Sequence, residues 1–239
     1  MDEKIRIDKL LSNLGYGSRK QIKKYASQGK IIINGNIIDD TSKLIDPYND
    51  NIILNGEKVY YSKYKYVVMN KPQNYICANS DPIHKLVFDL LDANLSRYEL
   101  STAGRLDKDT EGLLILTNDG NFIHELISPN KNIYKKYLVH TDFPLSEYSI
   151  QKLREGIVLI TENYITKPAI VNKISDNIYE ISIMEGKYHQ IKRMISAVGS
   201  KVTYLKRIQI GGYVLPDSLN PGEYIEVKKT DLDKILDHN

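Results

Sequence analysis

The chain has 239 residues, of which 41% are hydrophobic and 26% are charged, a composition typical of globular proteins that excludes wholesale disorder. Its longest runs without a charged residue, such as Pro72–Ser80 and Ile208–Pro216, have only nine residues, whereas a membrane-spanning helix needs about twenty. The charged N-terminus lacks the apolar core of a secretion signal, and the single cysteine, Cys77, cannot form an internal disulfide or a thiolate metal cage. These observations favour a protein of the reducing cytoplasm.

The net charge of +3 identifies no partner, but the basic residues are clustered. Residues 4–30 contain eight Lys and Arg residues against one Asp, and residues 31–62 contain two Lys residues against five acidic ones. A second cluster, over residues 185–207, has six basic side chains and one Glu. Two local basic patches on a nearly neutral chain predict a shaped site for a polyanion. Solvated helix faces are the alternative explanation for each patch.

The N-terminal residues predict two short helices and a hairpin. Apolar residues at positions 7, 10, 11 and 14 have the spacing of one helix face, and glycines at 15 and 17 end this helix. Ser18 begins a second helix, in which Gln21 completes a capping-box pattern. The apolar runs 31–33 and 37–38 flank Asn34-Gly35, a dipeptide that favours a tight type I′ turn. We therefore expect a compact module over residues 1–60 and a linker over residues 61–65.

The second predicted helix of this module has a basic outer face. The order of motifs, Arg-Ile-Asp-Lys-Leu-Leu, then Ser-Arg-Lys-Gln-Ile, then Ile-Ile-Asn-Gly, resembles the S4 RNA-binding domain. The resemblance implies that the basic face binds structured RNA, whereas a small helical cap without a ligand is the alternative. The side chains expected on this RNA-binding face are Arg6, Arg19, Lys20, Lys23 and Lys24.

From Tyr66 onward, short strand-like runs alternate with a few helices. The predicted strands cover residues 67–69, 113–117, 136–140, 169–174 and 178–183, and Pro72 ends regular pairing after the first of them. This mixture predicts an α+β domain over residues 66–239 with a largely antiparallel sheet. The expected fold class is therefore α+β, with a small S4-like module followed by a mostly antiparallel-sheet domain.

Two segments of the second domain carry candidate chemistry. An apolar stripe at positions 191, 194, 195 and 198 predicts a helix whose other face carries positions 189, 192, 193 and 196, directed toward a cleft or toward solvent. A charged loop between Gly104 and Gly112 leads into a predicted buried strand, and such loops often present reactive side chains. Its Asp107, Asp109 and Glu111 offer oxygen ligands for a hard cation, although neighbouring basic residues already supply positive charge.

Four ordered motifs of this domain resemble those of pseudouridine synthases. The catalytic motif corresponds to Gly-Arg-Leu-Asp at 104–107 followed by Thr-x-Gly-Leu-Leu at 110–114. The others are Asn-Lys-Pro at 70–72, Lys-Tyr-Leu-Val at 136–139 and Glu-Gly-Lys-Tyr-His-Gln-Ile-Lys-Arg-Met at 185–194. Together with the S4-like start, the resemblance spans nearly the whole chain. The last motif and Ile-Thr-Lys-Pro-Ala at 165–169 make the chain most similar to the small-subunit branch, that of ribosomal small-subunit pseudouridine synthase A.

The resemblance implies an enzyme that isomerises a uridine of RNA to pseudouridine with no cofactor and no metal. Asp107 is then the catalytic residue, because an ionised carboxylate can attack C1′ or remove a sugar proton. Lys192 is its cationic partner and favours the ionised form. Tyr137 is expected to stack on the flipped base and to assist proton transfer. The residues expected to bind the substrate or support its site are Arg105, Ile191, Arg193, Lys71 and His189.

The small-subunit branch implies a target in 16S ribosomal RNA, at position 516 of the conventional 16S numbering, either in naked RNA or in an assembly intermediate. Nothing in the sequence indicates an oligomer or a membrane partner, so we expect a monomer. Three alternatives stay open. They are a synthase for large-subunit ribosomal RNA with the same catalytic residues, a non-catalytic S4-type RNA-binding protein, and a metal-dependent nuclease that uses Asp107 and Asp109.

Overall fold

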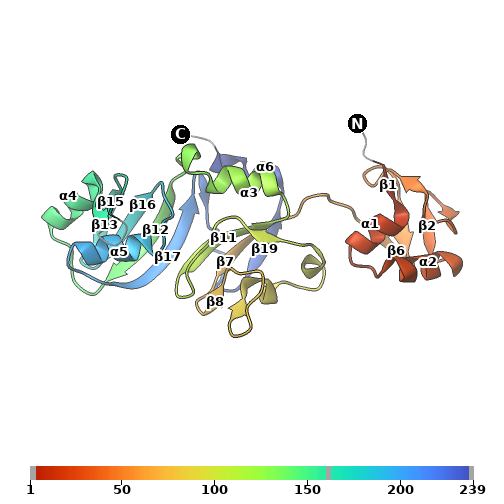
Figure 1. Ribbon diagram of the computed structural model, residues 1–239, viewed down its shortest axis with the longest axis horizontal. Helices are drawn as coiled ribbons and strands as arrows, with labels where there is room; N and C mark the ends of the chain where they lie inside the picture. The colour runs from red at the N-terminus through yellow and green to blue at the C-terminus, as the bar shows by residue number, and fades with distance from the viewer. Residues whose placement is uncertain (1–3, 160–162, 237–239) are drawn as a thin grey trace. The chain divides into compact units, whose positions relative to one another are not determined.

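The structure, a computed structural model, describes residues 4–159 and 163–236 and divides into two compact units (Figure 1). The outermost residues of the two predicted domains, 1–3 and 237–239, lie outside the described residues. The first unit comprises Met1–Tyr64 together with Leu91–Glu99, and the second comprises Lys65–Leu90 and Leu100–Asn239. The chain first passes from one unit to the other between Tyr64 and Lys65, and Leu91–Glu99 return to the first unit.

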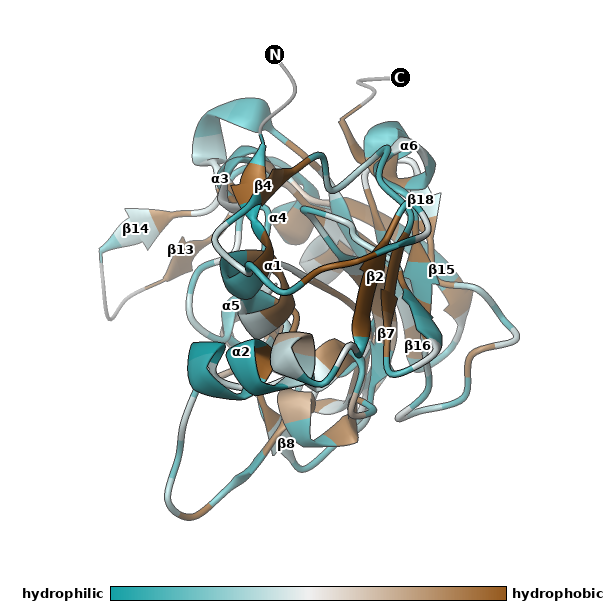
Figure 2. Cartoon of the chain, turned by 90° about the vertical axis from the view of Figure 1, so that its right-hand side faces the viewer, coloured by the Kyte–Doolittle hydropathy of each residue, from teal (hydrophilic) through white to brown (hydrophobic). Residues whose placement is uncertain are grey.

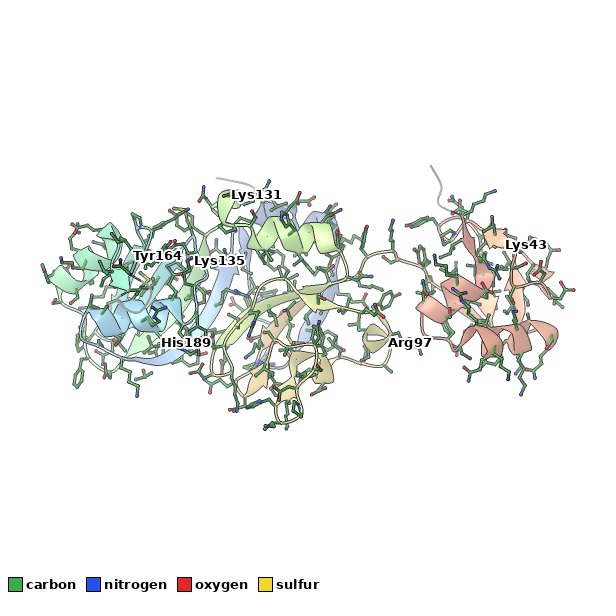
Figure 3. The ribbon with its side chains drawn as sticks, in the orientation of Figure 1. Lys43, Arg97, Lys131, Lys135, Tyr164 and His189 are labelled. Atoms are coloured by element: carbon green, nitrogen blue, oxygen red, sulfur yellow. The ribbon has the colours of Figure 1, made fainter. Side chains whose placement is uncertain are left out.

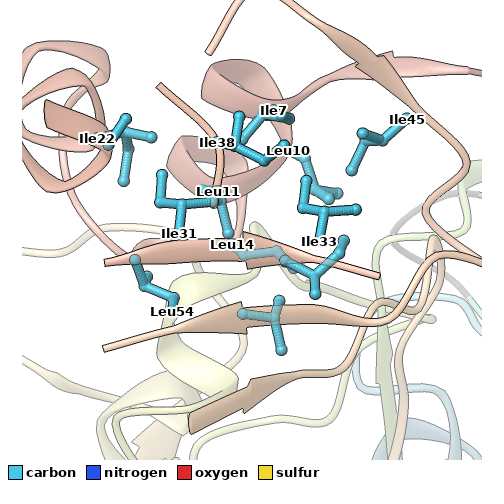
Figure 4. Close-up of a cluster of buried hydrophobic side chains, with 13 residues drawn as sticks. Ile7, Leu10, Leu11, Leu14, Ile22, Ile31, Ile33, Ile38, Ile45 and Leu54 are labelled. Carbon is cyan, nitrogen blue, oxygen red and sulfur yellow. The ribbon is translucent and has the colours of Figure 1, made fainter. Parts of the chain in front are cut away.

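The first unit contains the two predicted helices and the predicted hairpin. Its elements are β1 (Ile5–Arg6), α1 (Ile7–Asn13), α2 (Arg19–Ser27), β2 (Ile31–Ile33), β3 (Asn36–Ile37), β4 (Leu44–Ile45), β5 (Ile52–Leu54) and β6 (Glu57–Val59). The strands form a sheet of order β3-β2-β5-β6 and a separate β1-β4 pair. One face of α1 and the inner residues of α2 close over this sheet in a single apolar cluster, which Figure 4 shows.

Local sequence signals explain these elements. At the start of α2, the Ser18 Oγ accepts a hydrogen bond from the Gln21 amide at 3.3 Å, and the Gln21 side chain accepts one from the Ser18 amide at 2.7 Å, which confirms the predicted capping box. Between β2 and β3, Asn34 and Gly35 both have positive φ, 51° and 82°, as a type I′ turn requires. The predicted S4-like arrangement of helices and hairpin is therefore confirmed.

One segment that the sequence analysis assigned to the second domain packs with the first unit instead. The Arg97 guanidinium lies 5.1 Å from the centroid of the Tyr16 ring, and Tyr98 packs against the apolar cluster of α1 and α2. A Cβ on Gly15 would lie 2.7 Å from the Arg97 Cγ, so this approach requires glycine at position 15. The predicted range 66–239 missed this because contacts between residues so distant in the chain leave no local pattern.

The second unit is built on one large sheet. The described strands follow the order β15-β16-β12-β17-β11-β7-β19, with β10 beside β11 and β18 beside β17. Every pair in this sheet is antiparallel except β11–β17, which confirms the predicted α+β class. Its strands are β7 (Tyr66–Lys71), β10 (Ser101–Thr102), β11 (Glu111–Thr117), β12 (Lys135–Thr141), β15 (Ile170–Ser175), β16 (Ile178–Ile183), β17 (Val202–Ile210), β18 (Tyr213–Val214) and β19 (Tyr224–Val227).

The other described elements of this unit are short strand pairs, α-helices and 3₁₀ helices. They are β8 (Tyr75–Ile76), β9 (Lys85–Leu86), β13 (Val158–Leu159), β14 (Tyr164–Ile165), α3 (Gly120–Ile127), α4 (Glu147–Glu155), α5 (Gln190–Ala197), α6 (Lys229–Leu232), η1 (Val87–Leu90), η3 (Pro129–Lys131) and η5 (Asp233–Ile235). Side chains of α3 and α6 share one core with β7 and β11. The predicted stripe of α5 is confirmed, because Ile191, Met194 and Ile195 are buried. Across residues 4–159 and 163–236, no helix has the length and apolar character needed to cross a membrane.

The parallel contact between β11 and β17 joins the two parts of the sheet beside the charged loop. Gly112 pairs with Arg207 there and has a φ of +106°. A Cβ at position 112 would lie 2.2 Å from the Arg207 carbonyl oxygen, closer than any real contact of that kind. The glycine of the Thr-x-Gly-Leu-Leu motif thus permits the approach that places the charged loop at this junction.

Candidate active site

Asp107 lies in the charged loop before β11 and is paired with a cation from α5. The Lys192 Nζ is 3.0 Å from the Asp107 Oδ2 and 2.5 Å from the Asp109 Oδ1. The side chains of Lys192 and Asp107 are 22% and 29% exposed, so the pair is only partly shielded from water. The structure brings together the two residues that the sequence analysis paired. It adds Asp109 as a second partner of the same ammonium group, which sequence reasoning missed.

The electrostatics of this cluster favour its ionised form. Burial opposes the charge on Lys192, but hydrogen bonds to Asp109 and Asp107 outweigh it and raise the pKa of Lys192. Burial also opposes ionisation of Asp109, and the hydrogen bond from Lys192 reverses this, so that the pKa of Asp109 is lowered. These two shifts favour the charged forms of Lys192 and Asp109.

The three acids of the loop do not converge as cation ligands would. Asp107 and Asp109 share the Lys192 ammonium, whereas the Glu111 Oε2 accepts a hydrogen bond from the Tyr204 hydroxyl at 2.6 Å. In the described part of the chain, no group of three or more His, Cys, Asp or Glu side chains is arranged to hold a metal ion. The arrangement is that of an ion-paired carboxylate rather than of a coordination sphere.

Lys71, expected to bind the substrate or support its site, lies behind the charged loop. Its side chain is fully buried, and its Nζ donates hydrogen bonds of 2.9–3.0 Å to the carbonyl oxygens of Pro72, Asp107 and Thr110. Burial lowers the pKa of Lys71 to about 8. One of its acceptors is the carbonyl of Asp107 itself, so Lys71 anchors the backbone of the charged loop at that residue.

A cavity of about 440 Å³ opens beside Asp107 and is large enough for a small-molecule-sized ligand. Its apolar wall comes from Tyr137 on β12, Ile183 on β16, Ile191 on α5 and Leu205 on β17, all of which are at most 8% exposed. Its polar rim includes Arg105 and His189. Such a space suits a flat ring with a polar edge, held against the side chain of Asp107.

A tight turn leads from β16 into α5 and places His189 at the cavity. His189, labelled in Figure 3, has a left-handed backbone, with a φ of 48°, and its Nε2 lies 3.6 Å from the Asp107 Oδ2. The helical spacing of the sequence had placed His189 on a face of α5, but the helix begins one residue later. Glu185 secures the turn, since it accepts hydrogen bonds from Tyr164, the Lys167 amide and Gln190. Sequence reasoning gave Glu185 no role.

The predicted site residues therefore fall into two groups. Arg105, Asp107, Tyr137, His189 and Ile191 line the cavity, and Lys192 joins them through its ion pair. Arg193, expected at the substrate, is not among the cavity-lining residues, and its Nη1 donates to the Tyr188 carbonyl at 3.2 Å. Tyr188, which sequence reasoning did not single out, does line the cavity.

The first unit carries a separate basic surface on α2, whose hydrophilic outer side is teal in Figure 2. Three lysines of this helix, Lys20, Lys23 and Lys24 (the α2 lysines), line a surface groove of about 500 Å³ together with Ser18 and Ser27. Arg19 is exposed at the start of the same helix. Arg6, also expected on this surface, makes two hydrogen bonds, of 3.1 and 2.8 Å, to the buried carboxylate of Asp8.

Comparison with known proteins accounts for both units. The sequence profile of the family described as RNA pseudouridylate synthase matches residues 65–197, and the S4 domain profile matches residues 5–50. A solved structure described as a pseudouridylate synthase superimposes with a TM-score of 0.69 at 37% identity, covering 97% of this chain and 99% of that one. The fold and the two-domain arrangement along the sequence are thus shared over almost the whole chain.

Several relatives are similar over nearly their full lengths. An uncharacterised RNA pseudouridine synthase of Bacillus subtilis is 43% identical, over 95% of this chain and 97% of its own. Proteins named ribosomal small subunit pseudouridine synthase A are 37% identical in Yersinia pestis, over 92% of this chain and 93% of theirs, and 32% identical in Escherichia coli, over 97% and 100%. The chain therefore belongs to the RNA pseudouridine synthase family of isomerases, in the branch that combines the catalytic domain with an S4 domain.

Proposed function

We propose that the chain converts one uridine of 16S ribosomal RNA to pseudouridine, with Asp107 as the reactive carboxylate. The observation that carries this proposal is the 3.0 Å pair between the Lys192 Nζ and the Asp107 Oδ2, at the edge of a cavity walled by Tyr137 and Ile191. Support for a small-subunit target comes from the relatives in Yersinia pestis and Escherichia coli, whose names specify the ribosomal small subunit.

The reaction needs an ionised carboxylate rather than an electron carrier. The bond between N1 and C1′ breaks, a bond between C5 and C1′ forms, the hydrogen of C5 leaves as a proton and N1 gains one, so no oxidation occurs. Asp107 either attacks C1′ or removes the C2′ proton, and both routes require its charged form. Lys192 holds that charge in a site where the base displaces water, at a distance where a cation favours ionisation.

The cavity walls fit the base that must leave its stack. Flipping a nucleotide out costs a few kcal/mol, which contacts in the pocket have to offset. Tyr137 would stack on the uracil ring and place its hydroxyl near the moving protons, and Ile191 would pack on the other side. Arg105, exposed at the rim, would occupy the vacated space or hold neighbouring phosphates. His189 would contact the nucleotide beside Asp107.

The α2 lysines would dock the RNA through its phosphates, because they line a groove on the first unit without acidic residues among its lining. Residues 1–60 would then form the RNA-binding module and residues 66–239 the catalytic domain that isomerises the uridine. Residues 61–65 would link the two. On this proposal the enzyme acts in the cytoplasm, as a monomer, on RNA or on an assembly intermediate.

The test is pseudouridine mapping by carbodiimide labelling and primer extension, on ribosomal RNA from cells with and without the gene. We expect loss of one small-subunit signal, restored by the wild-type gene but not by an Asp107→Asn variant. Loss of a large-subunit signal instead would keep the chemistry and overturn the target. An unchanged map, together with no activity of the purified enzyme on transcribed RNA, would favour a non-catalytic RNA-binding protein.

A further inference from the structure

Tyr188 and His189 form an aromatic pair at the cavity that the reaction itself does not require. Their rings are stacked, with centroids 3.8 Å apart and planes inclined by 18°. Both residues line the cavity, and the inner ring, His189, lies 3.6 Å from Asp107. The outer ring, Tyr188, is 74% exposed. A flat aromatic surface therefore extends from the reactive carboxylate toward solvent.

The backbone holds this pair in a strained but fixed conformation. His189 is a non-glycine residue in the left-handed region, a state that costs of order 1 kcal/mol and persists where its surroundings enforce it. The Gln190 amide donates to the Lys187 carbonyl at 3.1 Å, and the Lys187 amide donates to the Gln190 Oε1 at 2.9 Å. The Arg193 Nη1 holds the Tyr188 carbonyl from the next turn of α5. The rings are thus positioned before any ligand arrives.

From this geometry we propose that Tyr188 is the stacking platform for a nucleobase next to the isomerised uridine. This inference rests on the proposed function, since the flipped uridine occupies the cavity and its neighbour in the strand must leave at the rim. Exposed aromatic rings are the surfaces on which proteins stack unpaired bases. His189 backs the Tyr188 ring on its inner side, so the open outer side is the one that takes the base.

Replacement of Tyr188 has a matched control in the same unit. Tyr148 on α4 is 72% exposed, nearly the same as Tyr188, but it is not among the residues lining the cavity. We expect Tyr188→Ala to weaken binding of the RNA fragment about 5- to 150-fold, the range of about 1–3 kcal/mol per stacked base at 1.36 kcal/mol per factor of ten. Tyr188→Phe keeps the aromatic ring, so its affinity for the RNA fragment should stay within twofold of wild type. The affinity of Tyr148→Ala should also stay within twofold of wild type.

The RNA supplies the second half of the test. The fragment is one in which the position of the modified uridine has been mapped. An abasic residue on one side of that uridine should lower the affinity of the wild-type enzyme for the fragment. The same change should leave the affinity of Tyr188→Ala unchanged. The chain has no tryptophan, so Tyr188→Trp provides a single fluorescent reporter that the stacked base should quench and the abasic RNA should not.

The outcomes separate the inference from the function on which it rests. If the wild-type enzyme isomerises the fragment and Tyr188→Ala binds it with an affinity within twofold of wild type, Tyr188 is not a stacking platform. The proposed function would still stand. A fall in kcat with unchanged binding would make Tyr188 a support for His189 and would also overturn the platform. If the wild type isomerises neither this fragment nor intact ribosomal RNA, the proposed function itself fails.

Discussion

Replacing Lys192 by methionine tests the ion pair at the centre of the site. Methionine keeps a long unbranched side chain but removes the ammonium 3.0 Å from the Asp107 Oδ2. At an effective dielectric constant near 20, charges at this distance interact by about 5 kcal/mol. Water reaches both side chains, which are 22% and 29% exposed, and Asp109 shares the ammonium. We therefore expect a net loss of about 2–3 kcal/mol, in the upper part of the usual range for hydrogen bonds to charged groups.

That loss predicts a kcat about 30- to 150-fold below wild type, because each 1.36 kcal/mol changes a rate tenfold. Single-turnover kinetics on a saturating RNA fragment isolate the chemical step, and RNA affinity should change less than threefold. Lys192→Arg retains the positive charge, so its kcat should fall less than tenfold below wild type. A Lys192→Met enzyme with kcat within threefold of wild type would refute the reasoning, and weaker RNA binding at unchanged kcat would make Lys192 a phosphate contact.

Three other features give predictions of their own. Gly112→Ala places a Cβ 2.2 Å from the Arg207 carbonyl oxygen, so urea unfolding should show about 2–5 kcal/mol less stability, and a silent substitution would contradict the close approach. Burial and the charge of Arg207 lower the pKa of Lys135 to about 8. Between pH 8 and about 10.4 the Lys135 side chain keeps its proton in the unfolded chain but has released it in the folded one, so Lys135 should add about 1–3 kcal/mol of stability as the pH rises, and Lys135→Met should remove that share of the rise. Neutralising the α2 lysines should lower the salt slope of RNA binding by about 2–3, whereas an unchanged slope would place the RNA elsewhere.

Sequence patterns predicted the elements whose signals are local. The apolar face of α1, the capping box of Ser18 and Gln21 and the Asn34-Gly35 turn each depend on residues within a few positions of one another. The apolar stripe of α5 could be predicted equally well, because the helical spacing of apolar residues is present in the sequence whatever the helix packs against. Family resemblance then supplied the pairing of Asp107 with Lys192, which no periodicity indicates.

The features that escaped prediction are long-range or depend on a single backbone angle. Asp109 reaches Lys192 across 83 residues of chain, and the packing of Arg97 with Tyr16 likewise has no local sequence signal. Helical spacing extended α5 back to His189, although that residue adopts the left-handed conformation before the helix begins. For Lys71 the motif indicates only that the residue supports the site, while the fold shows which carbonyl oxygens its ammonium group contacts.

The most direct test of the central claim is tritium release from RNA labelled at C5 of uridine, since the new bond at C5 expels that hydrogen. Asp107→Asn and Asp109→Asn form a matched pair, because both remove one charge from a carboxylate that contacts Lys192. We expect Asp107→Asn to release no tritium while still binding the RNA, and Asp109→Asn to release tritium at a rate within threefold of wild type. Release by Asp107→Asn at a near wild-type rate would remove Asp107 from the mechanism, and the reverse pattern would make Asp109 the reactive carboxylate.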